Sequence, residues 1–237
     1  MFSGFFAFFT AYSIIMLIAY KVDPRFSLKN KKATSIEDLV SLSVVERMLL
    51  FLLLVVFSFI PALDIFASFG LATMFQNPPM EVLFGFFFGI VTFVLGMPID
   101  ALILIIRRRL SIPKTEREEK LARFVSVSRS RSKAQMVLKI TVATFLIALL
   151  EEIIFRGYFI YYLGLLAPLS VAIIVQSLVY FSAYLYQGFH KGLLTLFSGF
   201  MFGITFYFTG SLLAAILAHL IRDFAALTIQ FSKKRLS

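Results

Sequence analysis

Long apolar runs recur along the chain and limit what it can fold into more than any other feature of the sequence. A helix needs about 20 consecutive apolar residues to cross the ~30 Å hydrocarbon core of a bilayer. Runs of this order cover residues 2–20, 48–75, 81–106, 137–166, 169–187, 192–208 and 211–231. Since 60% of the residues are hydrophobic and the mean hydropathy is +0.92, the chain cannot cover its surface with polar groups in water. We therefore predict an all-α, polytopic membrane bundle of about seven transmembrane helices.

The second apolar run contains Pro61 and Asp64. Proline removes a backbone donor and kinks or ends a helix, so this run is either one bent span or a span followed by an interfacial piece. An eighth helix therefore stays open. On the third run, Gly85 and Gly89 form a G-x-x-x-G spacing, which predicts close packing against a neighbouring helix rather than chemistry.

Basic residues lie between the apolar runs and predict the orientation of the chain. The 21–47 loop holds six Lys or Arg, the 107–139 segment holds eleven, and three more occupy 233–235. Loops without Lys or Arg lie near 66–81, 167–169 and 209–211. Because positive charge concentrates on the cytosolic side, we expect the N-terminus outside and the C-terminus in the cytosol.

This charge pattern also divides the chain into four parts. We expect N-terminal transmembrane helices over 1–106, a basic cytosolic or interfacial segment over 107–136, a motif-bearing transmembrane core over 137–232 and a cytosolic tail over 233–237. The basic segment either binds anionic lipid headgroups or is a solvated loop that sets topology. The net charge of +10 thus indicates membrane lipids rather than nucleic acid as partners. The absence of Cys excludes disulfides, thiol catalysis and Cys-based zinc sites.

Three ionisable residues, Glu151, Glu152 and Arg156, lie inside the fourth apolar run. Each ionised group there costs about 2.5 to 3.5 kcal/mol on insertion scales, so a partner must offset that cost. Glu152 and Arg156 are four residues apart and share a helix face, whereas Glu151 points about 100° away and needs another partner. Two adjacent carboxylates in a low-dielectric site suit a general base and its support. The alternative is a buried salt bridge that fixes helix packing.

A second polar cluster lies in the last apolar run, where His219 and Asp223 are four residues apart with Arg222 beside them. Such a histidine can donate to a carbonyl oxygen, ligate a metal or position a water, and the aspartate can orient its ring. The alternative is a His and Asp pair that holds two helices together.

The sequence E-E-I-I-F-R-G-Y at 151–158 resembles the E-E-x-x-x-R-G signature of the CAAX prenyl protease and bacteriocin-processing family (CPBP, also called Abi). The stretch 199–223 is similar to that family's last two motif helices, and His219 and Asp223 match its H-x-x-x-N or H-x-x-x-D element. The similarity covers about residues 140–225. The family's middle motif, F-x-x-x-H, differs here: Tyr180 aligns with the Phe and Tyr184 with the His.

The resemblance implies an intramembrane endopeptidase that hydrolyses a membrane-associated peptide or protein, either prenylated or bacteriocin-like. Glu151 would activate water and Glu152 would support it through Arg156. His219 and Asp223 would stabilise the oxyanion, and Tyr184 would stand where a histidine normally shares the water. With one His in the set, a metal-independent glutamate mechanism is favoured over the three-ligand pattern of zinc enzymes, although zinc stays open.

Two other functions remain. A catalytically impaired homologue would bind such substrates as a membrane scaffold or immunity-type protein, and the Tyr184 replacement keeps this alternative open. A transporter or channel is less favoured because no repeated half is evident. The predicted spans also place Tyr184 nearer the cytosolic leaflet than Glu151, so a shared site requires a tilted helix.

Overall fold

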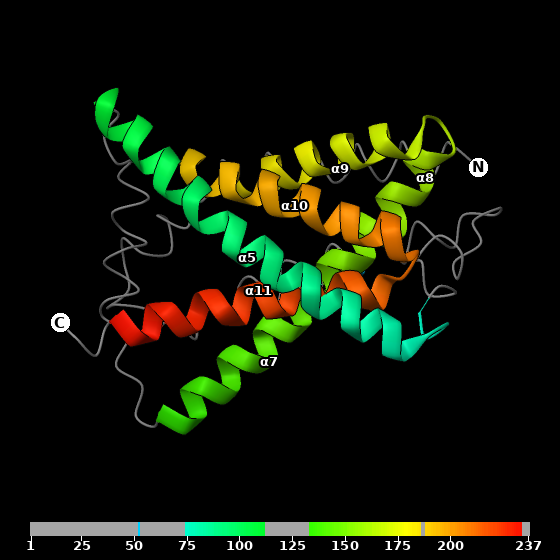
Figure 1. Cartoon of the computed structure of the whole chain (residues 1–237), viewed down its shortest axis with the longest axis horizontal. Coiled ribbons are helices and arrows are strands. Elements are labelled where there is room, and N and C mark those ends of the chain that lie inside the picture. Colours follow the sequence, from blue (N-terminus) through cyan, green and yellow to red (C-terminus); the bar gives the residue numbers. More distant parts are fainter. Residues whose placement is uncertain (1–51, 53–73, 112–132, 186–187, 234–237) are drawn as a thin grey trace.

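The computed structural model describes residue 52 and residues 74–111, 133–185 and 188–233 (Figure 1). The described ranges are helical and contain no strand. The helical elements are α5 (Pro78–Arg109), α7 (Lys133–Glu152), η2 (Ile153–Phe159), α8 (Ile160–Gly164), α9 (Leu169–Tyr184), α10 (Phe189–Thr209) and α11 (Leu212–Lys233). The predicted all-α class is therefore confirmed.

Within the described residues, three helices are long and apolar enough to cross a membrane, as judged by length and composition. They are α5, α10 and the Leu212–Ile229 part of α11, while α9 is a shorter apolar helix. The predicted runs at 2–20 and 48–75 lie outside the described residues, apart from Leu52 and residues 74 and 75. The count of seven or eight helices, the four-part division and the orientation of the termini stay predictions.

Local sequence explains where the helices begin and end. Two prolines open α5 after Asn77, because proline has no N–H to leave unpaired in a first turn. The Glu81 carboxylate then accepts hydrogen bonds from the backbone N–H groups of Phe75 and Asn77, both at 3.1 Å. Pro168 precedes α9. Gly210, with φ of 62°, ends α10 in the left-handed conformation that glycine adopts without strain.

The helix predicted over 137–166 is interrupted by a π-helical segment. Its seven residues, η2, begin directly after Glu152, and all of them are buried. The backbone N–H of Ile160 donates to the carbonyl of Phe155, the i to i+5 pairing that defines this geometry. Apolar periodicity predicts a regular helix and does not detect one extra residue in a turn. Segments of this kind occur frequently at functional sites.

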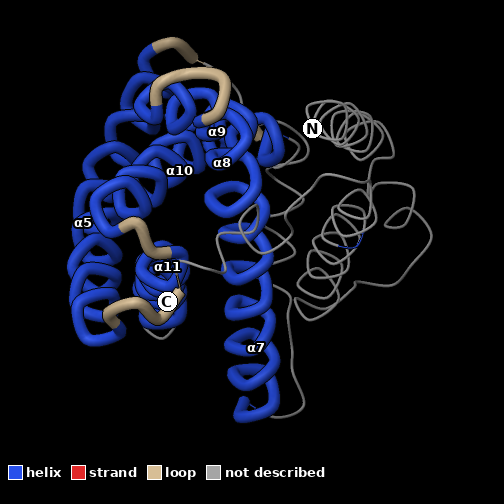
Figure 2. Tube along the Cα trace, turned by 90° about the vertical axis from the view of Figure 1, so that its right-hand side faces the viewer, coloured by secondary structure: helices blue, strands red, loops and turns tan. Residues whose placement is uncertain are grey.

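Helix α11 packs between α5 and α7 and also contacts η2 and α10 (Figure 2). The predicted close approach at the G-x-x-x-G spacing is confirmed. A Cβ atom at Gly85 would lie 2.7 Å from the Leu217 Cβ, and one at Gly89 would lie 2.9 Å from the carbonyl oxygen of Ala218. Because Ala218 precedes His219, this contact helps to set the position of the histidine.

Gly89→Ala is expected to destabilise the bundle by about 1–3 kcal/mol, since the added methyl group meets the backbone of α11. Thermal unfolding in detergent measures the effect. Gly96→Ala on the same helix is the matched control, because its nearest heavy atom, Phe197 Cε1, is 3.9 Å away. Equal midpoints of thermal unfolding for Gly89→Ala and Gly96→Ala would contradict the close contact between α5 and α11.

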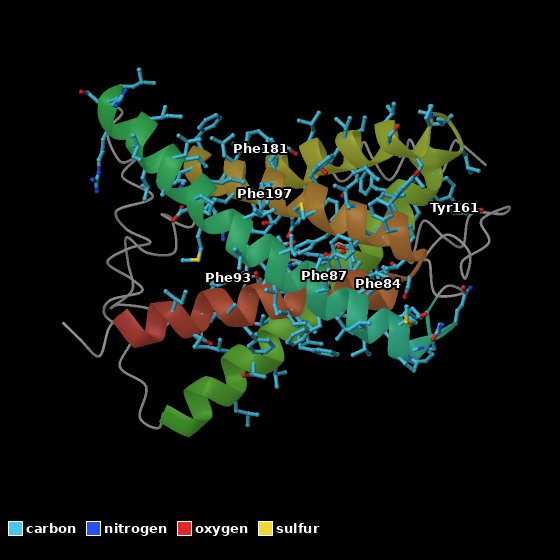
Figure 3. All side chains as sticks on the ribbon, viewed as in Figure 1. Phe84, Phe87, Phe93, Tyr161, Phe181 and Phe197 are labelled. Carbon is cyan, nitrogen blue, oxygen red and sulfur yellow. The ribbon has the colours of Figure 1, made fainter. Side chains whose placement is uncertain are left out.

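The outward face of the bundle is apolar. Phe84 and Phe87 are 38% and 57% exposed, and Figure 3 shows them along α5, with Phe197 on α10 and Phe181 on α9. Large apolar side chains left uncovered over whole helices are costly in water but favourable against lipid tails. This surface supports the assignment of the chain as an integral membrane protein.

Candidate active site

Four helical elements bring together the six residues singled out in the sequence. The end of α7 supplies two carboxylates, η2 supplies the guanidinium, α9 supplies a phenol, and α11 supplies an imidazole and a carboxylate. These residues are Glu151, Glu152, Arg156, Tyr184, His219 and Asp223. Polar atoms of each lie within 4.0 Å of another member of the set.

Glu152 stands at the centre of this cluster. Its Oε1 accepts a hydrogen bond from Arg156 Nη1 at 3.0 Å, so the pair expected from the i, i+4 spacing is confirmed. The same oxygen lies 2.7 Å from His219 Nδ1 on α11. Because an ionised carboxylate only accepts hydrogen bonds, the Nδ1 atom carries the proton in this contact. The carboxylate thereby fixes the orientation of the ring.

The orientation of His219 directs its second nitrogen towards the other carboxylates. Nε2 lies 4.0 Å from Glu151 Oε2 and 3.4 Å from Asp223 Oδ2. The ring also stacks on Phe202, with centroids 4.7 Å apart and an interplanar angle of 21°. The hydrogen bond at one ring nitrogen of a histidine, together with the packing of its ring, determines which way the other nitrogen points.

Arg156 is fully buried, and its charge is compensated from several directions. Besides Glu152, it donates from Nη2 to the carbonyl oxygen of Gly199 on α10 at 2.9 Å. The guanidinium carbon lies 5.2 Å from the ring centroid of Tyr180 and 5.3 Å from that of Phe202, within cation–π range. Arg156 therefore ties η2 to both α9 and α10.

Glu151, also fully buried, has different partners from its neighbour. Tyr184 Oη donates to Oε1 at 2.6 Å, and Tyr180 Oη donates to Oε2 at 2.6 Å. Tyr184 thus meets the carboxylate despite its predicted place nearer the cytosolic leaflet. Tyr180 was aligned with an apolar motif position and was not among the predicted site residues. Its spacing of four residues from Tyr184 was the signal that both hydroxyls share one face of α9.

Two further polar pairs lie around this cluster. Arg222 Nη1 donates to Asp223 Oδ1 at 2.6 Å, and the Asp223 side chain is 24% exposed. His190, the other histidine of the chain, lies 2.7 Å from Asp100 Oδ1 through its Nε2. Its Nε2 partner is therefore on α5, whereas Glu151 is contacted from α9 by Tyr184.

The donor set bears on whether a metal belongs here. Among the described residues, no three His, Cys, Asp or Glu side chains form a group arranged to hold a metal ion. Both oxygens of Glu151 accept phenol hydrogens, and Glu152 Oε1 is shared by Arg156 and His219. The cluster thus places the Glu151 carboxylate beside oriented hydrogen-bond donors.

Residues 133–225 match the family model described as Type II CAAX prenyl endopeptidase Rce1-like. The matched segment begins with the first residue of α7, ends within α11 and contains all six residues of the cluster. No curated protein and no solved structure matches the chain.

Proposed function

We propose that the protein is an intramembrane endopeptidase using a glutamate-activated water, and the premise of the proposal is the match of residues 133–225 to the Rce1-like type II CAAX prenyl endopeptidase model. The supporting observation is the contrast between adjacent carboxylates. Glu152 is bound to a guanidinium and an imidazole, whereas Glu151 accepts hydrogen bonds from two neutral hydroxyls. Glu152 is thereby suited to a structural role, and Glu151 is suited to proton transfer.

In the proposed reaction, Glu151 takes a proton from water while the water oxygen attacks the carbonyl carbon of the scissile peptide bond. The carbonyl oxygen becomes an oxyanion, and His219 Nε2 donates a hydrogen bond to it. As the C–N bond breaks, Glu151 gives its proton to the leaving amine, and the second proton of the water stays on the new carboxylic acid, which releases it to solvent. The products are a carboxylate-terminated and an amine-terminated peptide. Glu151 returns to its starting state.

Asp223 supports this step through His219 in the proposal. An ionised carboxylate cannot donate to an oxyanion, but Asp223 Oδ2 lies 3.4 Å from His219 Nε2 and Glu152 lies at the opposite nitrogen. In the proposal the ring is doubly protonated, with the Nδ1 proton held by Glu152 and the Nε2 proton offered to the substrate. Arg156 supports the same donor by holding Glu152.

Membrane-associated peptides are the proposed substrates, either prenylated or bacteriocin-like. The cluster is enclosed by helices whose outer faces are apolar, so a lipid-anchored peptide reaches it more readily than a peptide in bulk water. Membrane lipids are the expected surroundings, and nucleic acid is not an expected partner. With the N-terminus outside, α9 would place Tyr184 towards the cytosolic half of the bilayer.

A cleavage assay tests the proposal. Purified protein in detergent is incubated with a prenylated CAAX-type peptide and separately with a bacteriocin-like peptide, and the products are identified by mass spectrometry. We expect cleavage of at least one peptide, unaffected by a zinc chelator, because the proposed mechanism uses no metal ion. Loss of cleavage with chelator and recovery with zinc would replace the glutamate mechanism by a metal-dependent one.

The alternative function is a scaffold or immunity-type protein that binds such peptides without cutting them. The observation that favours it is that both Glu151 oxygens accept phenol hydrogens, where a general base needs a water. If the wild type binds peptide but is inert and Tyr184→His confers cleavage, the protein is an impaired protease. Cleavage by the wild type would eliminate this alternative.

A further inference from the structure

Two phenols from successive turns of α9 hold one carboxylate. Tyr180 and Tyr184 each donate to a different oxygen of Glu151, both at 2.6 Å, and their rings meet edge to face with centroids 5.2 Å apart. Bonds from O–H groups to an ionised oxygen are among the stronger hydrogen bonds in proteins. Because each oxygen has its own donor, the carboxylate plane is restrained against rotation. We call these three residues the Glu151 clamp.

The two phenols are not equivalent. Tyr180 is 2% exposed, and its ring lies edge to face against Phe155, with centroids 4.7 Å apart. The guanidinium of Arg156 covers the same ring at 5.2 Å. A Cβ atom at Gly199 would lie 2.8 Å from Tyr180 Cδ1, so the ring fills the space that the glycine leaves. Turning Tyr180 away would require its neighbours to move.

Tyr184 has a looser environment. It is the last residue of α9 and is only partly buried. A partly buried side chain at a helix end can change rotamer at lower cost than a fully buried one enclosed by packed rings. The outer phenol can therefore leave Glu151 while the inner phenol stays.

We propose that Tyr180 is a positioning residue that holds Glu151 Oε2 throughout the reaction, whereas the hydroxyl of Tyr184 is the donor that an incoming water replaces at Oε1. This inference deepens the proposed function and rests on it for its catalytic consequence. Tyr180 is thus the fixed half of the Glu151 clamp, and Tyr184 is its exchangeable half. The water then meets a carboxylate that is already oriented.

Tyr180→Phe tests the fixed half, because it removes the hydroxyl and keeps the ring. We expect kcat to fall about 10- to 100-fold, the equivalent of one hydrogen bond to a charged group, with KM unchanged. Tyr162→Phe is the matched control, since Tyr162 is also buried in the same apolar core and its ring packs against Tyr158 and Tyr161. Equal kcat for Tyr180→Phe and wild type would overturn the positioning role.

A second readout does not depend on activity. The chain has no tryptophan, so its tyrosine emission can be measured directly, and a phenol bonded to a carboxylate is quenched by excited-state proton transfer. Glu151→Gln should raise the tyrosine emission when it is introduced into the wild-type protein. The rise should be smaller when Glu151→Gln is introduced into the Tyr180→Phe variant. An identical rise in both backgrounds would overturn the clamp.

The two readouts separate this inference from the proposed function. If the wild type cuts no peptide but the emission depends on both Glu151 and Tyr180, the peptidase proposal fails and the clamp is supported. If peptide is cut, Glu151→Gln abolishes cleavage and Tyr180→Phe changes neither kcat nor emission, the peptidase proposal is supported and the clamp fails.

Discussion

Glu151→Gln is expected to lower peptide cleavage by about 10²- to 10⁴-fold, the usual contribution of a general base. The amide has nearly the shape of the carboxylate but cannot take a proton from water. The wild type and the variant can be compared by mass spectrometry of the cleaved peptide under single-turnover conditions. Folding should be retained, because an amide can still accept from one phenol and donate to the oxygen of the other.

Glu81→Gln is the matched control for this prediction. Glu81 is also a buried carboxylate, 4% exposed, but it caps the start of α5 and contacts backbone N–H groups there. It should leave the rate of cleavage unchanged. If Glu151→Gln cleaves at the rate of Glu81→Gln, the base lies elsewhere in the molecule.

Arg156→Met is expected to destabilise the folded protein by about 3–5 kcal/mol, the cost of leaving one member of a buried ion pair without its partner. The methionine fills the space of the side chain but removes the guanidinium from Glu152, which is 0% exposed and keeps only the contact with His219. It also removes the donor to the Gly199 carbonyl. Chemical unfolding in detergent, followed by tyrosine emission, measures the loss.

Two further variants test whether the buried Glu152 charge causes the loss of stability in Arg156→Met. Adding Glu152→Gln to Arg156→Met should recover part of the lost stability, because no buried carboxylate then lacks its guanidinium partner and coupled residues are not additive. Arg222→Met should cost less than Arg156→Met, since its partner Asp223 is partly exposed and water screens the remaining charge. Equal losses for Arg156→Met and Arg222→Met would contradict the assigned role of the buried pair.

Helix positions were largely predictable from the sequence. The run at 81–106 became α5 at Pro78–Arg109, and the run at 192–208 became α10 at Phe189–Thr209. The reason is that a bilayer requires long uninterrupted apolar stretches, and breakers such as Pro168 and Gly210 stand between them. The Glu152 to Arg156 pair was predictable for the same kind of reason, because it lies within one helical turn.

Contacts between distant segments were not predictable. Glu152 and His219 are 67 residues apart and Glu151 and Tyr180 are 29 apart, and their meeting depends on how tilted helices cross. The π-helical turn of η2 was also missed, since one inserted residue leaves the apolar pattern nearly intact.

The sequence by itself determined that the chain is an all-α membrane protein with ionisable residues inside its apolar helices, because composition and local periodicity carry that information. Only the tertiary structure decided which carboxylate has which partners. Glu152 joins Arg156 to His219, and Glu151 is held by two tyrosines. The physical reason is that hydrogen bonds have a reach of about 3 Å, so partners are chosen by helix packing rather than by position in the chain.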